Sequence, residues 1–120
     1  MADDQSRNRR IRKLNDQFRQ EMPHGRVIIS AGVSMFSNDQ LAEITQAICA
    51  FDAFGAEIDP LNEHDNGTLE YAGIELCWVI DACGEYREFI SPDPADERVT
   101  RRFLLIMLKD EAQVSLGLRL

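Results

Sequence analysis

The segment Glu63-His64-Asp65 places an imidazole between two carboxylates, which are groups able to carry acid–base chemistry or to bind a metal ion. Asp81 and Asp59 are the carboxylates that would complete such a set. Adjacent residues of an extended loop point in different directions, however, and metal sites usually gather ligands from separate elements. The alternative is structural, with Asp65 building a turn and His64 satisfying buried backbone groups.

The sequence contains only weak signals for other kinds of catalytic or binding site. The sequence contains no G-x-S-x-G, no phosphate-binding glycine pattern and no H-E-x-x-H. Cys77 and Cys83 share strand parity with Asp81, but the only histidine besides His64 is His24, in a distant turn, so a thiol enzyme is not expected. Arg101-Arg102 either clamps a phosphate or carboxylate or pairs with nearby acids. We therefore expect no cofactor and no bound metal, and Glu63, His64, Asp65 and Asp81 are the catalytic candidates if the protein is an enzyme.

Charge is distributed unevenly along the chain. The net charge is −8, yet residues 1–26 hold seven basic side chains against four acids. Between Val27 and Glu97 there are fifteen acids and one base, Arg87. This body would repel phosphate backbones and would suit a basic protein partner, unless the acidity serves solubility alone. The candidate partner-binding residues are Glu75, Asp81, Glu85, Glu88, Asp59 and Glu63.

The basic cluster from Arg7 to Lys13 has two interpretations. It binds nucleic acid or an acidic partner, or it docks onto the acidic body of its own chain.

Length and composition predict a single domain over residues 1–120, with about 1–6 and 113–120 frayed. No apolar run is long enough to span a membrane, and the first residues lack the apolar core of a secretory signal. Cys49, Cys77 and Cys83 include no CxxC pair and are an odd number, which favours free thiols and a cytoplasmic location.

The sequence pattern of the first half of the chain predicts a helix, a strand and a second helix. Apolar residues at spacings of three and four predict a helix over about 5–20 and a second from Asn38 to about 51–53, capped by Ser37. The β-branched run at 26–30 predicts a strand, and 57–67 is expected to be a loop.

The second half predicts a three-stranded meander over 68–71, 74–83 and 85–90, followed by a helix from Pro94 to about Leu108. Trp78 and its even-numbered neighbours are expected to face the core, leaving the odd face polar. The last helix is apolar on more than half its circumference, which allows a homodimer through it. The predicted class is α+β: an antiparallel sheet of about four strands with three helices, in the order α-β-α-β-β-β-α.

Several short motifs, in order, resemble a bacterial family catalogued as domain of unknown function 3768. They include Leu14-Asn15-Asp16-Gln17-Phe18-Arg19, Phe51-Asp52-Ala53-Phe54, Glu63-His64-Asp65 with Gly67, and Ser91-Pro92-Asp93-Pro94-Ala95-Asp96. The resemblance extends over about residues 10–111 and departs from the family pattern at Ala112. It implies a small stand-alone bacterial protein of the kind often carried near mobile elements, and it implies no activity.

These observations lead to two hypotheses. The first is a small acidic, non-enzymatic binding protein that engages a basic partner, in its sharpest form an anti-CRISPR or anti-restriction inhibitor of a nucleic-acid-handling complex. The alternative is a small enzyme or metal-binding protein using the Glu63-His64-Asp65 loop.

Overall fold

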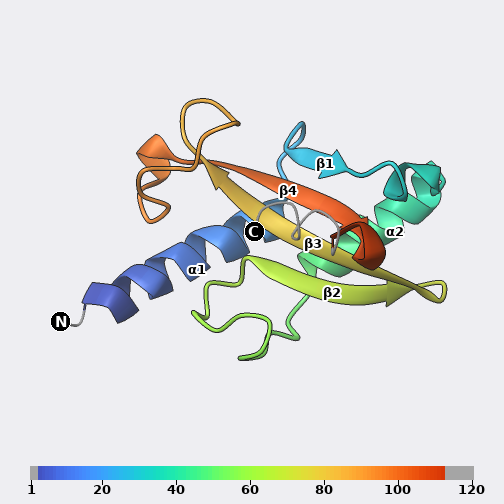
Figure 1. Cartoon of the computed structure of the whole chain (residues 1–120), viewed down its shortest axis with the longest axis horizontal. Helices are drawn as coiled ribbons and strands as arrows, with labels where there is room; N and C mark the ends of the chain where they lie inside the picture. The colour runs from blue at the N-terminus through green and yellow to red at the C-terminus, as the bar shows by residue number, and fades with distance from the viewer. Residues whose placement is uncertain (1–2, 113–120) are drawn as a thin grey trace.

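The computed structural model describes residues 3–112 and places two helices against one face of a four-stranded sheet (Figure 1). The main elements are α1 (Asp3–Glu21), β1 (Val27–Ile29), α2 (Asn38–Cys49), β2 (Asn66–Tyr71), β3 (Ile74–Cys83) and β4 (Arg101–Leu108). Two short 3-10 helices, Val33–Met35 and Glu97–Val99, lie in the connections. The class is therefore α+β. Within residues 3–112, no helix combines the length and apolar character needed to cross a membrane.

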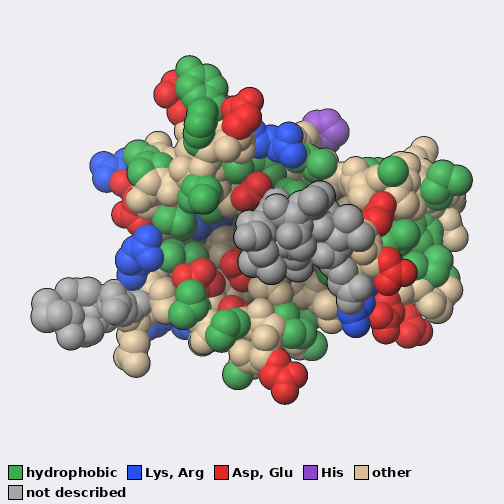
Figure 2. Space-filling view, viewed as in Figure 1, with side chains coloured by type: hydrophobic (Ala, Val, Ile, Leu, Met, Phe, Trp, Pro, Cys, Tyr) green, Lys and Arg blue, Asp and Glu red, His purple; other side chains and the backbone are tan. Residues whose placement is uncertain are grey.

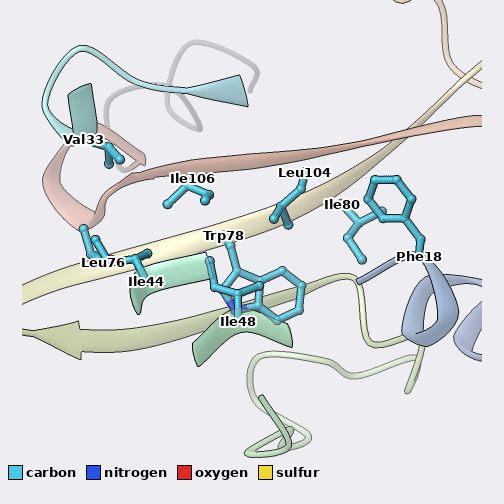
Figure 3. Packing of buried hydrophobic residues seen from close by; sticks show 9 residues of the cluster. All are labelled: Phe18, Val33, Ile44, Ile48, Leu76, Trp78, Ile80, Leu104 and Ile106. Carbon is cyan, nitrogen blue, oxygen red and sulfur yellow. The ribbon is translucent and has the colours of Figure 1, made fainter. Parts of the chain in front are cut away.

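The core lies between the helices and the sheet. Leu76 and Trp78 of β3 are buried beside Ile44 and Ile48 of α2, and Ile80 lies beside Phe18 of α1 (Figure 3). On α1 the predicted stripe is confirmed, because Ile11, Leu14 and Phe18 are all 9% exposed or less. The Ser37 cap of α2 is also confirmed, since the side chains and backbone amides of Ser37 and Gln40 hydrogen-bond reciprocally.

The sheet is mixed, so the prediction of a purely antiparallel sheet is wrong. Its strand order is β1-β4-β3-β2, and β1 runs parallel to β4. The β2–β3 hairpin is local and has a two-residue turn, which is why its pairing could be predicted. Val27 of β1 instead pairs with Leu104, and no local pattern specifies such a distant partner.

The predicted third meander strand (85–90) and final helix (94–108) are also wrong. Residues 84–90 form a loop with a single bridge from Cys83 to Ile90, and 101–108 form strand β4. β4 lies inside the sheet and carries apolar residues on both faces, with Leu104 and Ile106 buried on one and Phe103 and Leu105 half-buried on the other. Such a continuous apolar run fits a helix or a buried strand equally well by periodicity. The helix face expected to support a homodimer is therefore not formed.

Other expectations are met in part or fall outside the described residues. Residues 3–6 lie within α1, and the expectations for 1–2 and 113–120 concern residues outside the described ones. The odd face of β3 is less polar than predicted, because Cys77 and Cys83 are buried. All three cysteines are free.

Candidate functional site

The His64 side chain is held in position by two contacts. Its Nδ1 lies 2.8 Å from Asp16 Oδ1 of α1. Its ring stacks on Phe54, with centroids 3.7 Å apart and planes 4° from parallel. The side chain is 20% exposed. A carboxylate on Nδ1 favours the tautomer that carries its proton there and leaves Nε2 as the free ring nitrogen.

The backbone around His64 is held in an uncommon conformation. Asn62 and His64 have φ of 55° and 57°, in the left-handed region. Asp59 stabilises this shape, because its carboxylate accepts the backbone N–H groups of Glu63 (2.8 Å) and His64 (3.0 Å). Asp59 is 6% exposed, so it supports the loop from within instead of lying on a partner-facing surface as predicted.

Arg19 lies beneath this arrangement and is 2% exposed. It donates hydrogen bonds to Asp16 Oδ1 (2.9 Å) and to the Phe51 carbonyl (3.2 Å). Its guanidinium lies 5.2 Å from the Phe54 ring centroid and 5.6 Å from that of Trp78. Asp16 therefore bridges a buried cation and the imidazole, linking α1 to the loop.

A second polar contact fastens α1 beside the same loop. Asn15 donates to the Glu63 carbonyl (2.9 Å) and accepts from Arg102 Nε (2.6 Å), while Arg102 Nη2 donates to the Pro94 carbonyl (2.6 Å). Arg102 is 6% exposed and its burial lowers the pKa of the guanidinium. Arg102 is therefore occupied internally, whereas its neighbour Arg101 is exposed.

The structure does not bring the four catalytic candidates together. Burial, followed by the charge of Asp65, raises the pKa of Glu63. Asp65 accepts from Asn66 Nδ2 at 2.9 Å, and its carbonyl accepts the Ile80 amide at 2.7 Å. Asp81 lies on the face of β3 opposite Trp78, whereas His64 packs on the Trp78 side through Phe54. No three His, Cys, Asp or Glu side chains gather into a possible metal site in the part of the chain that the structure describes.

Sequence reasoning missed Asp16 and Arg19. Their spacing of three on one helix is visible in the sequence, but it is ordinary for a helical ion pair. The contact to His64 spans 48 positions of sequence, so only the fold reveals it.

A hollow of about 420 Å³ opens beside His64. Its lining includes Asp16, Arg19, Gln20, Cys49, Asp52 and His64. Burial raises the pKa of the Cys49 thiol, while Arg19 acts in the opposite direction. This cysteine is thus not activated as a nucleophile.

The predicted partner-binding acids do not form one surface. Glu75 lies directly across from Glu70 in the β2–β3 hairpin, and Lys109 is 3.3 Å from it. Glu85 and Glu88 lie beyond the other end of β3, which spans ten residues and hence roughly 30 Å. The predicted acids Glu75, Glu85 and Glu88 therefore lie in two regions, one at each end of the strand, and Figure 2 shows other acidic side chains elsewhere on the visible face.

The second acidic region carries exposed apolar side chains. In the 84–90 loop (Gly84–Ile90), Tyr86 is 60%, Phe89 63% and Ile90 86% exposed. The loop projects from the end of the sheet and shows apolar and acidic groups side by side at the top of Figure 2. Backbone hydrogen bonds close its base, from Gly84 N to Phe89 O (2.8 Å) and from Ser91 N to Ala82 O (3.0 Å). Phe89 and Ile90 belong to this hydrogen-bonded base, so their exposed side chains are held in place by the backbone. The three exposed side chains of Tyr86, Phe89 and Ile90 are here called the apolar tip.

The family model described as "Protein of unknown function (DUF3768)" matches residues 29–111. The chain belongs to this family. The family resemblance seen in the sequence is confirmed over residues 29–111, although it was expected from about residue 10. The match takes in the His64 loop, the 84–90 loop and strands β2, β3 and β4, but only the last residue of β1. It begins after α1, so Asp16 and Arg19 lie outside it. No curated protein and no solved structure matches the chain.

Proposed function

We propose that this protein is a non-enzymatic binding protein that engages a basic protein partner through its 84–90 loop. The observation that carries the proposal is the exposure of Tyr86, Phe89 and Ile90, each 60% or more, beside Glu85 and Glu88. Aromatic and aliphatic anchors with a charged rim are the usual composition of a protein interface.

Burying the apolar side chains of this loop against a partner protein is more favourable than leaving them exposed to water. Large apolar side chains gathered in one place raise the free energy of the hydrated surface, and a soluble protein rarely groups them without an interaction. Tyr86 and Phe89 also contact each other edge to face, with centroids 6.5 Å apart. They present a shared apolar tip.

The acids determine the kind of partner. The chain from Val27 to Glu97 carries fifteen acids and one base, and Arg87 lies within the loop itself. The acids of the loop would attract, at long range, a partner that has a basic rim around an apolar pocket. The apolar tip would then bind in that pocket. In its finer form, the proposal makes that partner a nucleic-acid-handling complex whose basic site this protein occupies, as an anti-CRISPR or anti-restriction inhibitor would.

The test is capture from bacterial lysate by the tagged full chain, compared between variants. F89S/I90S removes the apolar tip, E85Q/E88Q removes the acids, and E57Q is the control because Glu57 is an exposed acid in a different loop. We expect one basic protein or complex to be retained by the wild type and E57Q, and to be reduced in both loop variants. Identical captured proteins across all four baits would refute the proposal, provided that thermal melting shows all four to be folded.

A further inference from the structure

The exposed face of α1 carries a row of cations that the docking interpretation does not explain. Among the side chains described (residues 5–112), Arg7 pairs with Asp93 at 3.2 Å and Arg12 donates to the Asn62 carbonyl at 3.2 Å. Arg9 and Lys13 form no ion pair in that part of the chain, although the protein has many more acids than bases. Contacts with the rest of the chain thus account for Arg7 and Arg12, and they leave Arg9, Arg10 and Lys13 exposed without an ion pair among the described side chains.

These cations line an open groove of about 850 Å³ along α1. Asp16 and Gln20 line both this groove and the hollow beside His64. Arg9, Lys13, Asp16 and Gln20 are spaced by three or four residues, so they lie along one side of the helix. The basic row therefore leads directly to His64.

His64 has a ring nitrogen available at the end of this row. Nδ1 faces Asp16, whereas Nε2 has no hydrogen-bond partner among the described side chains and backbone. Nε2 is also not among the buried polar atoms left without partners, and the side chain retains 20% exposure. An imidazole fixed on one nitrogen and open on the other is suited to contact a ligand through the second.

We propose that the basic face of α1 and His64 form one site for a phosphate-bearing ligand, with Arg9 and Lys13 meeting its charge and His64 Nε2 donating a hydrogen bond to a phosphate oxygen. Donation from both ring nitrogens requires the imidazolium form, with Asp16 as its counter-ion. Arg9 and Lys13 are four residues apart, or about 6 Å of helix, and the groove continues past Asp16 to the hollow beside His64, so the site is long enough for adjacent phosphates of a single strand of nucleic acid. The site lies on α1 and the His64 loop, so it differs from the protein-binding loop and does not depend on it.

Binding should therefore take up a proton at His64. The charged and titratable groups around this ring are Asp16 and Arg19 from α1, Cys49 at the end of α2, Asp52 after it, and Asp59, Glu63 and Asp65 in its own loop. Since a bound phosphate adds negative charge beside the ring, the imidazolium is stabilised in the complex. Affinity should fall as the pH rises above the range in which the imidazole is protonated.

The experiment measures binding of a short labelled oligothymidylate to the full chain by fluorescence anisotropy at low salt. R9Q and K13Q should each weaken binding by about two- to tenfold, because each removes one phosphate contact. R101Q is the matched control, since Arg101 is an exposed arginine on β4, outside this groove, and should leave the affinity unchanged. Equal affinity of R9Q, K13Q and the wild type would overturn the proposal.

A second readout follows the ring directly by imidazole ¹⁵N NMR, which is simple because the chain has two histidines. The His64 Nε2 signal should move toward the protonated value on titration while that of His24 stays in place. H64N retains a side chain tolerant of left-handed backbone and should bind with a loss of the pH dependence. A response to oligothymidylate alone assigns the site to a strand, and an equal response to inorganic phosphate or thymidine monophosphate assigns it to a single phosphate. No response of His64 to any of the three would overturn the proposal.

Discussion

At the scale of single residues, Asp16 connects a buried cation to the candidate site. It accepts from buried Arg19 at 2.9 Å and from His64 at 2.8 Å. D16A would leave the guanidinium of Arg19 buried without its counter-ion, and uncompensated buried charges are strongly destabilising. We expect a loss of about 2–4 kcal/mol in the free energy of unfolding, measured by urea denaturation. E57Q should change stability by less than about 0.5 kcal/mol, and a D16A loss no larger than that would show that the bridge contributes little.

Gly67 is the second residue with a specific consequence. A Cβ at this position would lie 2.8 Å from Phe51 Cε1 and 2.8 Å from Trp78 Cε2, closer than the packed rings allow. G67A should therefore destabilise the protein by about 1–3 kcal/mol through overpacking. Gly55 is the control, because a Cβ there would have no heavy atom within 4 Å. Thermal unfolding in which G67A matches G55A would contradict this account of the aromatic packing.

At the scale of elements, Glu111 connects the end of β4 to the turn after β1. Its carboxylate accepts from Ser30 Oγ, from Gly32 N at 3.0 Å and from Leu108 N at 2.8 Å. The hydrogen bond from Ser30, and then those from the backbone, lower the pKa of Glu111 from its usual 4.5. A depressed carboxyl pKa gives stability that is present above the usual pKa and is lost as the pH falls through the folded value.

The corresponding variant is E111Q, which keeps the shape but cannot ionise. Wild type should be more stable than E111Q at neutral pH, and the difference should shrink as the pH falls below about 4.5. Denaturant unfolding at a series of pH values measures it. A stability difference that stays constant with pH would mean that the charge of Glu111 does not stabilise the folded protein.

Elements with local signals could be predicted from the sequence, and elements defined by distant contacts could not. The α1 stripe, the Ser37 cap and the β2–β3 hairpin are all encoded within a few residues. β4 was mistaken for a helix because Phe103 to Leu108 is apolar at every position and therefore has no period. The candidate site shows the same limit, since His64 was identified but its partner Asp16 lies on a distant helix.

At the scale of the whole molecule, the basic cluster and the acidic 84–90 loop lie in different places on the surface, as they do along the sequence. Basic residues occupy the exposed side of α1, and acids with exposed apolar groups occupy the 84–90 loop at the end of β3. The two proposed sites are therefore independent in location and opposite in charge preference. Neither requires the four sequence-predicted catalytic residues to act together, which the sheet prevents by placing Asp81 on its other face.

The most direct test of the central proposal is the salt dependence of binding between the purified chain and the partner that its loop captures. Wild-type affinity should fall as ionic strength rises. E85Q/E88Q should bind more weakly at low salt and with a shallower dependence, and F89S/I90S should bind weakly at every salt concentration. Unchanged affinity and salt dependence in both variants would contradict the claim that the 84–90 loop is the binding surface.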